Sequence, residues 1–290
     1  MKSRGTALNS SPTNGFGSRL RWWRDHRGVS QLALTGMAGI SQRHLSFVES
    51  GRTRPSREMV LRLAAALDVP LHEQNALLLA AGYAPVWRES MLGTPDLVPV
   101  NGALDFMLAQ QEPFPAFVID RRWNLLRANE GAARLVEFLT GPAPADPPPS
   151  GPVNLADALM APDGLRPLIV NWSDVACYFL RGVQADAVAD GTPETAALLK
   201  RLLAYPDVLA LSRLPPPAPA APVLAIDFQK DQTVLRLFTT IATLGTPQDV
   251  TAQEIRIECF FPADNQTGYW LRARAAAARQ APGDTLLPDR

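Results

Sequence analysis

Two neighbouring side chains, Gln42 and Arg43, carry the functional groups that read base edges in duplex DNA. A glutamine can pair with adenine through two hydrogen bonds, and an arginine can pair in the same way with guanine in the major groove. Both residues follow Ser41, whose hydroxyl suits an N-cap position, so a helix is expected to begin there. The sequence therefore predicts a base-reading helix with Ser41, Gln42 and Arg43 at its amino end.

The rest of this segment divides into two faces at helical spacing. Ile40, Leu45 and Val48 are spaced to face a core together. The opposite face then presents Ser46 and Phe47 beside the two base-reading side chains. An aromatic edge can touch a thymine methyl group, although Phe47 could equally pack against a neighbouring helix.

A tight turn is expected before this helix, at Gly39. Glycine adopts the left-handed backbone conformation of such a turn at a lower cost than a residue with a Cβ. Gln31 stands at the amino end of the preceding helix, where its backbone amide and side chain can hold a phosphate. His44 fits a surface or phosphate-side position better than a base-reading one. Two short helices joined at a tight turn are therefore expected.

At these residues the sequence resembles the lambda-repressor-like, XRE-type helix-turn-helix regulators. The matching elements are SQ at 30–31, AGIS at 38–41, LSFVESGR at 45–52, PS at 55–56 and LRLAAALDVP at 61–70. The resemblance implies a double-stranded DNA operator as partner, with Gln42, Arg43 and Phe47 at base-facing positions. It also implies that Gln31 anchors a phosphate and supports Gln42.

The same resemblance assigns roles outside the reading face. It implies an ion pair between Arg24 and Glu49 inside the domain, and it places Arg52 and Arg54 near the sugar-phosphate backbone. Loss of either phosphate-side arginine would weaken binding uniformly across sequences and lower the salt slope by roughly one counterion. Thr35 departs from the family, which favours alanine there, but threonine is small enough to fit.

The elements that position these residues are short helices separated by glycine and proline. Ser30, Ser41 and Ser56 suit N-caps, and Gly82 suits the residue after a helix end. The pattern predicts five helices, at about residues 17–27, 30–37, 41–49, 56–67 and 71–81. The expected organisation is a disordered arm at 1–15, the helix-turn-helix domain at 16–83, a linker and connecting helix at 84–112, a second domain at 113–275 and a tail at 276–290.

The charge of the chain is divided between these parts. The net formal charge is zero, but residues 1–90 carry Lys2 and eleven arginines against six acids, which leaves an excess of six acids in the remainder. A basic amino-terminal part on an acidic body is typical of a phosphate-binding domain attached to a second domain, although chance could also produce it.

The second domain begins with a strand, a turn at Asp120-Arg121 and another strand, within residues 116–129. Asn129 then suits the N-cap of an amphipathic helix that ends near Leu139. Later segments predict helices near 165–188 and 193–204, strands at 233–244 and 254–261, a final helix at 265–280 and proline-rich loops at 140–152 and 215–222.

PAS-type sensors open with the same order of strand, turn, strand and helix. With VNWSDVACYFL at 170–180 and the closing strands, residues 113–262 resemble the MmyB-like ligand-binding domain. The resemblance implies an α+β, PAS-like fold and a fatty-acid or acyl effector. A sheet covered by helices can enclose an apolar cavity whose occupancy moves the helices that join it to the DNA-binding domain.

Six aromatic residues are candidate walls of that cavity, with plain core packing as the alternative for each. Arg181 could meet a ligand carboxylate, although a surface ion pair would also explain it. The six aromatic candidates are Trp123, Trp172, Tyr178, Phe179, Phe238 and Phe260.

Catalysis and cofactor binding are not expected. All three histidines, His26, His44 and His72, lie in the first domain, which removes histidine-dependent triads and most zinc or iron sites from the second. Cys177 and Cys259 are too few and too dispersed for a disulfide framework or a thiolate metal site. The sequence lacks nucleotide-binding glycine motifs, a membrane-length apolar stretch and a signal peptide, so a cytoplasmic location is expected.

The resulting hypothesis is a ligand-responsive transcription regulator, acting as a homodimer on an inverted repeat with half-sites about one helical turn apart. The main alternative keeps the DNA-binding domain but gives the second domain only dimerisation or protein docking. A third reading is an acyl-binding carrier or enzyme whose first domain contacts protein. Mass spectrometry of organic extracts would separate a ligand-binding domain from a docking module.

Overall fold

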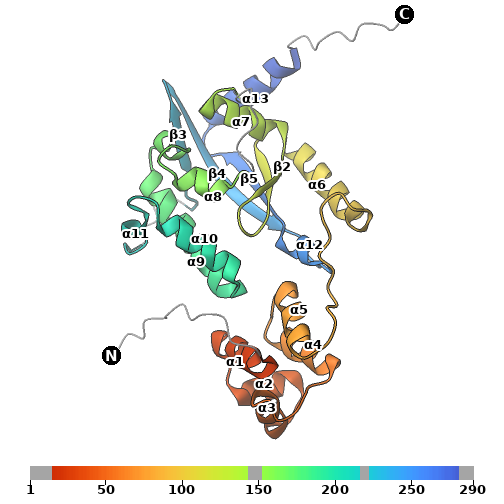
Figure 1. Ribbon diagram of the computed structural model, residues 1–290. Coiled ribbons are helices and arrows are strands. Elements are labelled where there is room, and N and C mark those ends of the chain that lie inside the picture. The colour runs from red at the N-terminus through yellow and green to blue at the C-terminus, as the bar shows by residue number, and fades with distance from the viewer. Residues whose placement is uncertain (1–14, 143–151, 216–221, 281–290) are drawn as a thin grey trace, which may run out of the picture. The chain divides into compact units, whose positions relative to one another are not determined.

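The computed structural model describes residues 15–142, 152–215 and 222–280 (Figure 1). The chain divides into two compact units, one formed mainly by the residues before Ser90 and the other mainly by the residues after it. The predicted amino-terminal arm, both proline-rich loops and the predicted tail fall largely outside the described residues. None of the helices in the described parts is both long and apolar enough to cross a membrane.

The first unit contains the five predicted helices, within a few residues of their expected bounds. Serine hydroxyls cap three of them: Ser30, Ser41 and Ser56 accept hydrogen bonds from backbone amides of the first turns of α2, α3 and α4. Gly82 follows the last helix with a φ of +79°. The bounds are α1 Phe16–His26, α2 Gln31–Ala38, α3 Gln42–Glu49, α4 Arg57–Ala66 and α5 Leu71–Ala80.

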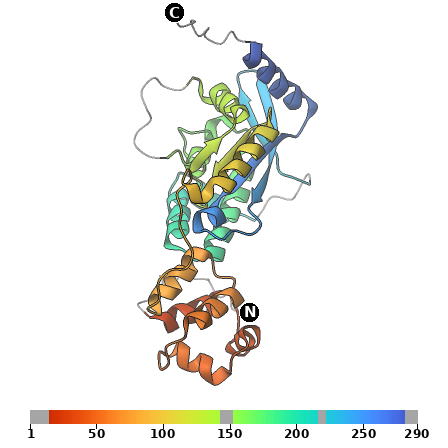
Figure 2. The same ribbon diagram turned by 90° about the vertical axis from the view of Figure 1, so that its right-hand side faces the viewer.

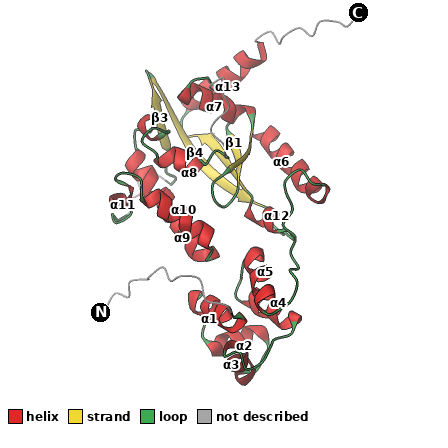
Figure 3. Cartoon of the chain, viewed as in Figure 1, coloured by secondary structure: helices red, strands yellow, loops and turns green. Residues whose placement is uncertain are grey.

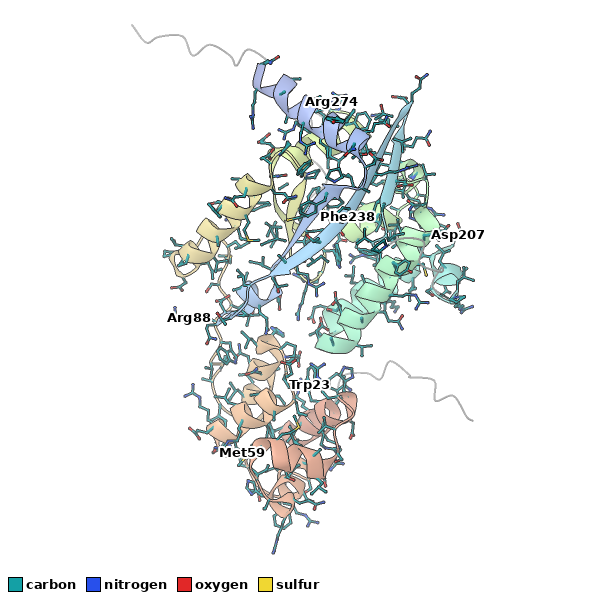
Figure 4. The ribbon with its side chains drawn as sticks, turned by 180° about the vertical axis from the view of Figure 1, so that it is seen from behind. Trp23, Met59, Arg88, Asp207, Phe238 and Arg274 are labelled. Carbon is teal, nitrogen blue, oxygen red and sulfur yellow. The ribbon has the colours of Figure 1, made fainter. Side chains whose placement is uncertain are left out.

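The five helices share one apolar core. Trp23, Leu34, Leu45, Val60 and Leu77 are each at most 1% exposed and come from five different helices. Figure 4 labels Trp23 on α1 and the half-buried Met59 on α4. Because every helix contributes to this one core, burial of apolar surface holds α2 and α3 in place.

Gly17 permits a close approach that the sequence did not indicate. A Cβ on Gly17 would lie 2.4 Å from the carbonyl oxygen of Glu49, at the end of α3. The Gly17→Ala variant should therefore lower the free energy of unfolding by about 1–3 kcal/mol, as overpacking does. Urea denaturation would measure the change. Gly36→Ala is the matched control, because its added Cβ would meet no atom within 4 Å apart from its chain neighbours and the backbone of its own helix. A Gly17→Ala variant as stable as the wild type would contradict the expectation.

The second unit is an α+β domain, as predicted, built on an antiparallel sheet of order β2-β1-β5-β4-β3. Figure 3 distinguishes the strands of this sheet from the helices around it. The strands are β1 Ala116–Ile119, β2 Leu125–Ala128, β3 Ile226–Lys230, β4 Thr233–Thr243 and β5 Arg256–Pro262. The helices are α6 Val98–Gln111, α7 Glu130–Thr140, α8 Leu155–Met160, α9 Trp172–Asp190, α10 Pro193–Leu203, α11 Val208–Leu211, α12 Val250–Glu254 and α13 Asn265–Gln280.

Asn129 joins the opening strands to α7, as its predicted cap position requires. Its side-chain oxygen accepts hydrogen bonds from the amides of Ala132, at 2.8 Å, and Ala116, at 2.9 Å. Its side-chain nitrogen donates to the carbonyl oxygen of Phe114 at 2.9 Å. One buried amide therefore connects the first turn of α7 to strand β1.

The two faces of the sheet have different neighbours. On one face, Val118 and Ile257 pack with Leu104 and Leu108 of α6, and Figure 2 shows α6 lying across the strands. In Figure 1, α8 and α9 lie on the other side of the sheet. Side chains alternate along a strand, so the residues of β1 and β5 that adjoin Val118 and Ile257 in the chain face α8 and α9.

Several boundaries differ from those expected. The helix predicted near 165–188 begins only at Trp172, because a short 3-10 turn, Arg166–Leu168, contains Pro167 and Ile169 then bridges to β3. The strand β3 and the short helices α8, α11 and α12 were not predicted. Helix α13, Asn265–Gln280, has the bounds that were predicted for the final helix.

Candidate nucleic-acid interface and ligand cavity

The turn between α2 and α3 has the predicted geometry. Gly39 adopts a φ of +62° and a ψ of +41°, and the amide of Ile40 donates to the carbonyl oxygen of Thr35. Thr35, the departure from the family, is buried and donates its own hydroxyl to the carbonyl oxygen of Leu32 at 2.6 Å. The hydroxyl is therefore satisfied within the helix, and the side chain is small enough for this position.

Helix α3 has the buried and exposed faces that the sequence predicted. Leu45 and Val48 are buried, whereas Gln42, Arg43 and Ser46 are exposed. Ser41 caps the helix by accepting a hydrogen bond from the amide of His44 at 3.2 Å. The three exposed polar side chains are therefore free of the core, as contact with base edges requires.

Phe47 is half-buried, which keeps both of its predicted roles open. The guanidinium carbon of Arg43 lies 5.4 Å from the centre of its ring, and that of Arg52 lies 5.9 Å away. Both distances suit cation–π contact. The ring therefore connects a predicted base-reading arginine to a predicted phosphate-side arginine, and it can order both side chains.

A buried ion pair joins α3 to α1, as the family resemblance implied. Arg24 donates from Nε to Oε1 of Glu49 at 2.7 Å and from Nη2 to Oε2 at 3.3 Å. Burial by itself raises the pKa of Glu49, but hydrogen bonds from Arg24 and Gln31 outweigh it and hold that pKa below its usual value. The pair joins the end of α1 to the end of α3.

Gln31 contributes to this ion pair rather than to Gln42. Its Nε2 donates to Oε2 of Glu49 at 2.8 Å, which directs the side-chain amide toward the carboxylate. Its predicted support of Gln42 is not among the contacts of this structure. Its predicted phosphate contact through the backbone amide stays a prediction, because the position at the start of α2 is as expected.

Arg52 and Arg54 have different surroundings. Arg52 is exposed, but Arg54 donates from Nε to the carbonyl oxygen of Ala81 at 2.8 Å and from Nη2 to that of Gly82 at 2.9 Å. The guanidinium of Arg54 also lies 4.9 Å from the ring centre of Tyr83. Arg54 therefore caps the end of α5, a structural role that its position in the sequence did not indicate.

The second unit contains an apolar cavity of about 270 Å³ between the sheet and helices α7, α8 and α9. Four of the predicted wall residues line it, namely Trp123, Tyr178, Phe179 and Phe260. Val175, Tyr178 and Phe179 lie on one face of α9, at helical spacing. The volume lies just below the usual range for small-molecule pockets, about 300–1,000 Å³.

A tight turn places Trp123 in the cavity wall. The side chain of Asp120 accepts hydrogen bonds from the amides of Arg122, at 2.8 Å, and Asn124, at 2.9 Å. Between them Trp123 adopts a φ of +66°, which is uncommon for a bulky residue. Its ring then meets Phe179 edge-on, with 4.6 Å between the ring centres.

Three predicted cavity residues lie elsewhere. Phe238, labelled in Figure 4, lies on the opposite face of β4 from Thr239, which lines the cavity. Its ring stacks on Phe261. Trp172 donates from Nε1 to the carbonyl oxygen of Leu159 at 3.0 Å. Arg181 is exposed and donates to the carbonyl oxygen of Leu214 at 2.9 Å. The alternation of β4 and the helical period of α9 decide these placements.

Glu258 is the cavity residue whose importance the sequence did not suggest. It lies on β5 opposite Phe117 of β1, only 8% exposed, among aromatic and aliphatic side chains. Burial raises its pKa to about 7, although a hydrogen bond from Thr239 partly opposes that rise. Its position between apolar residues of a strand is typical of a side chain that faces solvent, so no local pattern marks it as buried.

The raised pKa of Glu258 predicts that the second unit loses stability as the pH rises from about 4.5 to about 7. A carboxyl whose pKa rises on folding binds its proton more tightly in the folded state, so its contribution is present below pH 4.5 and is lost as the pH rises to about 7. The loss should approach about 3 kcal/mol. Tyr178 is the other ionisable side chain among the described residues that line the cavity.

Urea denaturation at pH 5 and pH 8 measures this effect. The wild-type second unit should be less stable at pH 8, and Glu258→Gln should remove most of the difference. Glu49 does not interfere in this range, because its pKa lies below 4.5. Equal pH dependence in both proteins would contradict the expectation.

Known proteins show similarity to both units. Residues 16–77 match a helix-turn-helix domain family, and residues 100–273 match the family of the MmyB-like transcription regulator ligand binding domain. The HTH-type transcriptional regulator DdrOP3 of Deinococcus deserti is 34% identical over 93 residues, which cover 28% of this chain and 72% of that protein.

One solved structure with weak overall likeness is an RNA-binding light-oxygen-voltage receptor. Its sequence is 13% identical, and the match covers 90% of this chain and 62% of that chain. The TM-score of 0.27 is too low to establish a shared arrangement of the whole chains.

Proposed function

The chain belongs to the MmyB-like transcription regulators, and from this premise we propose that a small apolar or acyl effector in its second unit controls its binding to operator DNA. DNA-binding transcription regulation follows from the helix-turn-helix match and from the regulator that resembles the first unit. Control by a ligand is a further proposal beyond DNA binding. The observation that supports it is the apolar cavity between the sheet and helices α7, α8 and α9.

The contacts with DNA are assigned to the exposed face of α3 and its neighbours. Gln42 and Arg43 read base edges, while Ser41, Ser46 and Phe47 complete the face that enters the major groove. Gln31, Arg52 and Arg54 hold phosphates. The exposure of Gln42, Arg43 and Ser46 supports this assignment, and for Arg54 a phosphate contact must coexist with its hydrogen bonds to the end of α5.

The operator is proposed to be an inverted repeat bound by a homodimer. One copy of α3 spans only one half-site, and two copies related by a two-fold axis would read half-sites about one helical turn apart. Selection of bound duplexes from a random library by the full chain tests this directly. The expected result is an enriched palindrome with that spacing, and a failure to enrich any sequence would contradict the proposed DNA recognition.

Ligand control has its own test. Purified full-length protein is extracted with organic solvent, and the extract is examined by mass spectrometry beside an extract of a Phe179→Arg variant, which places a charge in the cavity wall. A small apolar compound present only with the wild type supports the proposal. Its absence, together with operator binding that no added apolar compound changes, would favour a second unit that serves only dimerisation or protein docking.

A further inference from the structure

The cavity contains a buried acid without a buried base. Glu258 lies on β5 between apolar neighbours, and its hydrogen bond is with Thr239 of β4. Apart from Thr239 and Tyr178, the other described side chains that line the cavity are aromatic or aliphatic. A lysine or arginine is not among the described residues that line the cavity. An anionic ligand would therefore meet a carboxyl there and no cation.

We propose that the cavity selects an apolar ligand with a protonated amine, and that the carboxylate of Glu258 binds the amine. This inference rests on the proposed function, because it assumes that an effector occupies the cavity. The aromatic and aliphatic walls would cover the apolar part of the ligand, and Glu258 would fix its polar end. Arg181, which the sequence offered as a partner for a ligand carboxylate, lies outside this lining and donates to Leu214.

The electrostatics of the cavity favour an ammonium group over a carboxylate. A buried carboxylate without a cation loses its hydration, which is why burial raises the pKa of Glu258 to about 7. An ammonium within hydrogen-bond distance restores a favourable interaction for that charge and forms a charge-assisted hydrogen bond. A fatty acid would have to bind in its protonated form or keep its carboxylate outside the cavity.

The test compares three probes that share a chain and differ in the head group: octylamine, octanol and octanoate. Each is titrated into the full chain at pH 7.5, and binding is followed by calorimetry and by the fluorescence of the tryptophans, one of which, Trp123, lines the cavity. Octylamine should bind at least tenfold more tightly than octanoate. In Glu258→Gln, the affinity for octylamine should fall at least tenfold, while the affinity for octanol stays within threefold.

A second variant separates recognition from folding. Thr239→Val removes the hydroxyl that donates to Glu258 but keeps the carboxylate, so octylamine should remain the preferred probe. The comparison of head groups in the wild type needs no variant. It decides whether the cavity prefers an ammonium group to a carboxylate even if a variant is poorly folded. Tighter binding of octanoate than octylamine would overturn this inference alone, whereas binding of none of the three probes would overturn ligand occupancy and the inference together.

Discussion

Replacing both Gln42 and Arg43 with alanine is expected to abolish sequence-specific DNA binding and leave the fold intact. Both side chains are exposed on α3, so their removal creates no cavity in the core. A bidentate contact to a base contributes about 1–3 kcal/mol of discrimination. Loss of two such contacts should lower the affinity for the selected operator by about 30-fold to 20,000-fold relative to wild type.

The measurement is a titration of the operator and of a scrambled duplex at several salt concentrations. Non-specific binding should change little, apart from the loss of one positive charge. Arg62→Ala is the matched control, since it removes an exposed arginine from α4, outside the proposed reading face. If the double variant keeps the wild-type ratio of specific to non-specific affinity, α3 does not read the operator through these residues.

The Glu49→Ala variant is expected to unfold the first unit or bring it close to unfolding. Glu49 accepts hydrogen bonds from Arg24 and Gln31, and its removal leaves the largely buried Arg24 without its main counter-charge. Breaking one side of a buried ion pair costs about 3–5 kcal/mol. Single domains are stable by only about 5–15 kcal/mol, so DNA binding should be lost together with the fold.

Acid should weaken the first unit through the same ion pair. The folded pKa of Glu49 is below 4.5, so its contribution is present above that value and is lost as the pH falls through the folded pKa. Urea denaturation between pH 3 and pH 6 should show this loss in the wild type. Glu89→Ala, an exposed carboxylate in the same unit, should stay within about 0.5 kcal/mol of wild type. A similarly small effect at Glu49 would contradict the role of the ion pair.

The first unit was predictable because its signals are local. Ser30, Ser41 and Ser56 satisfy amides three residues away, and Gly39 adopts the one conformation that the turn needs. Helical spacing also separated the buried Leu45 and Val48 of α3 from its exposed polar face. Contacts between residues far apart in the sequence were harder to predict. Neither the close approach at Gly17 nor the hydrogen bonds from Arg54 to the end of α5 follows from the spacing of residue types.

The cavity was only partly predictable, because strand register decides its walls. Phe238 and Phe260 are both aromatic residues of strands, and only the pairing of β4 with β5 places Phe260 in the cavity and Phe238 on the opposite face. The strand β3 was missed, although its pairing with β4 completes the sheet. A shift of one residue in either strand would exchange the two faces.

The sequence by itself determined the helix that follows Ser41, its turn and its exposed polar face, because caps, glycine conformation and helical period act within a few residues of each other. Only the tertiary structure decided the surroundings of Glu258, which separate segments of the chain create by packing around one strand position. A carboxyl on a strand is ordinary in solvent and costly in an apolar cavity, and the sequence carries no local mark that tells the two apart.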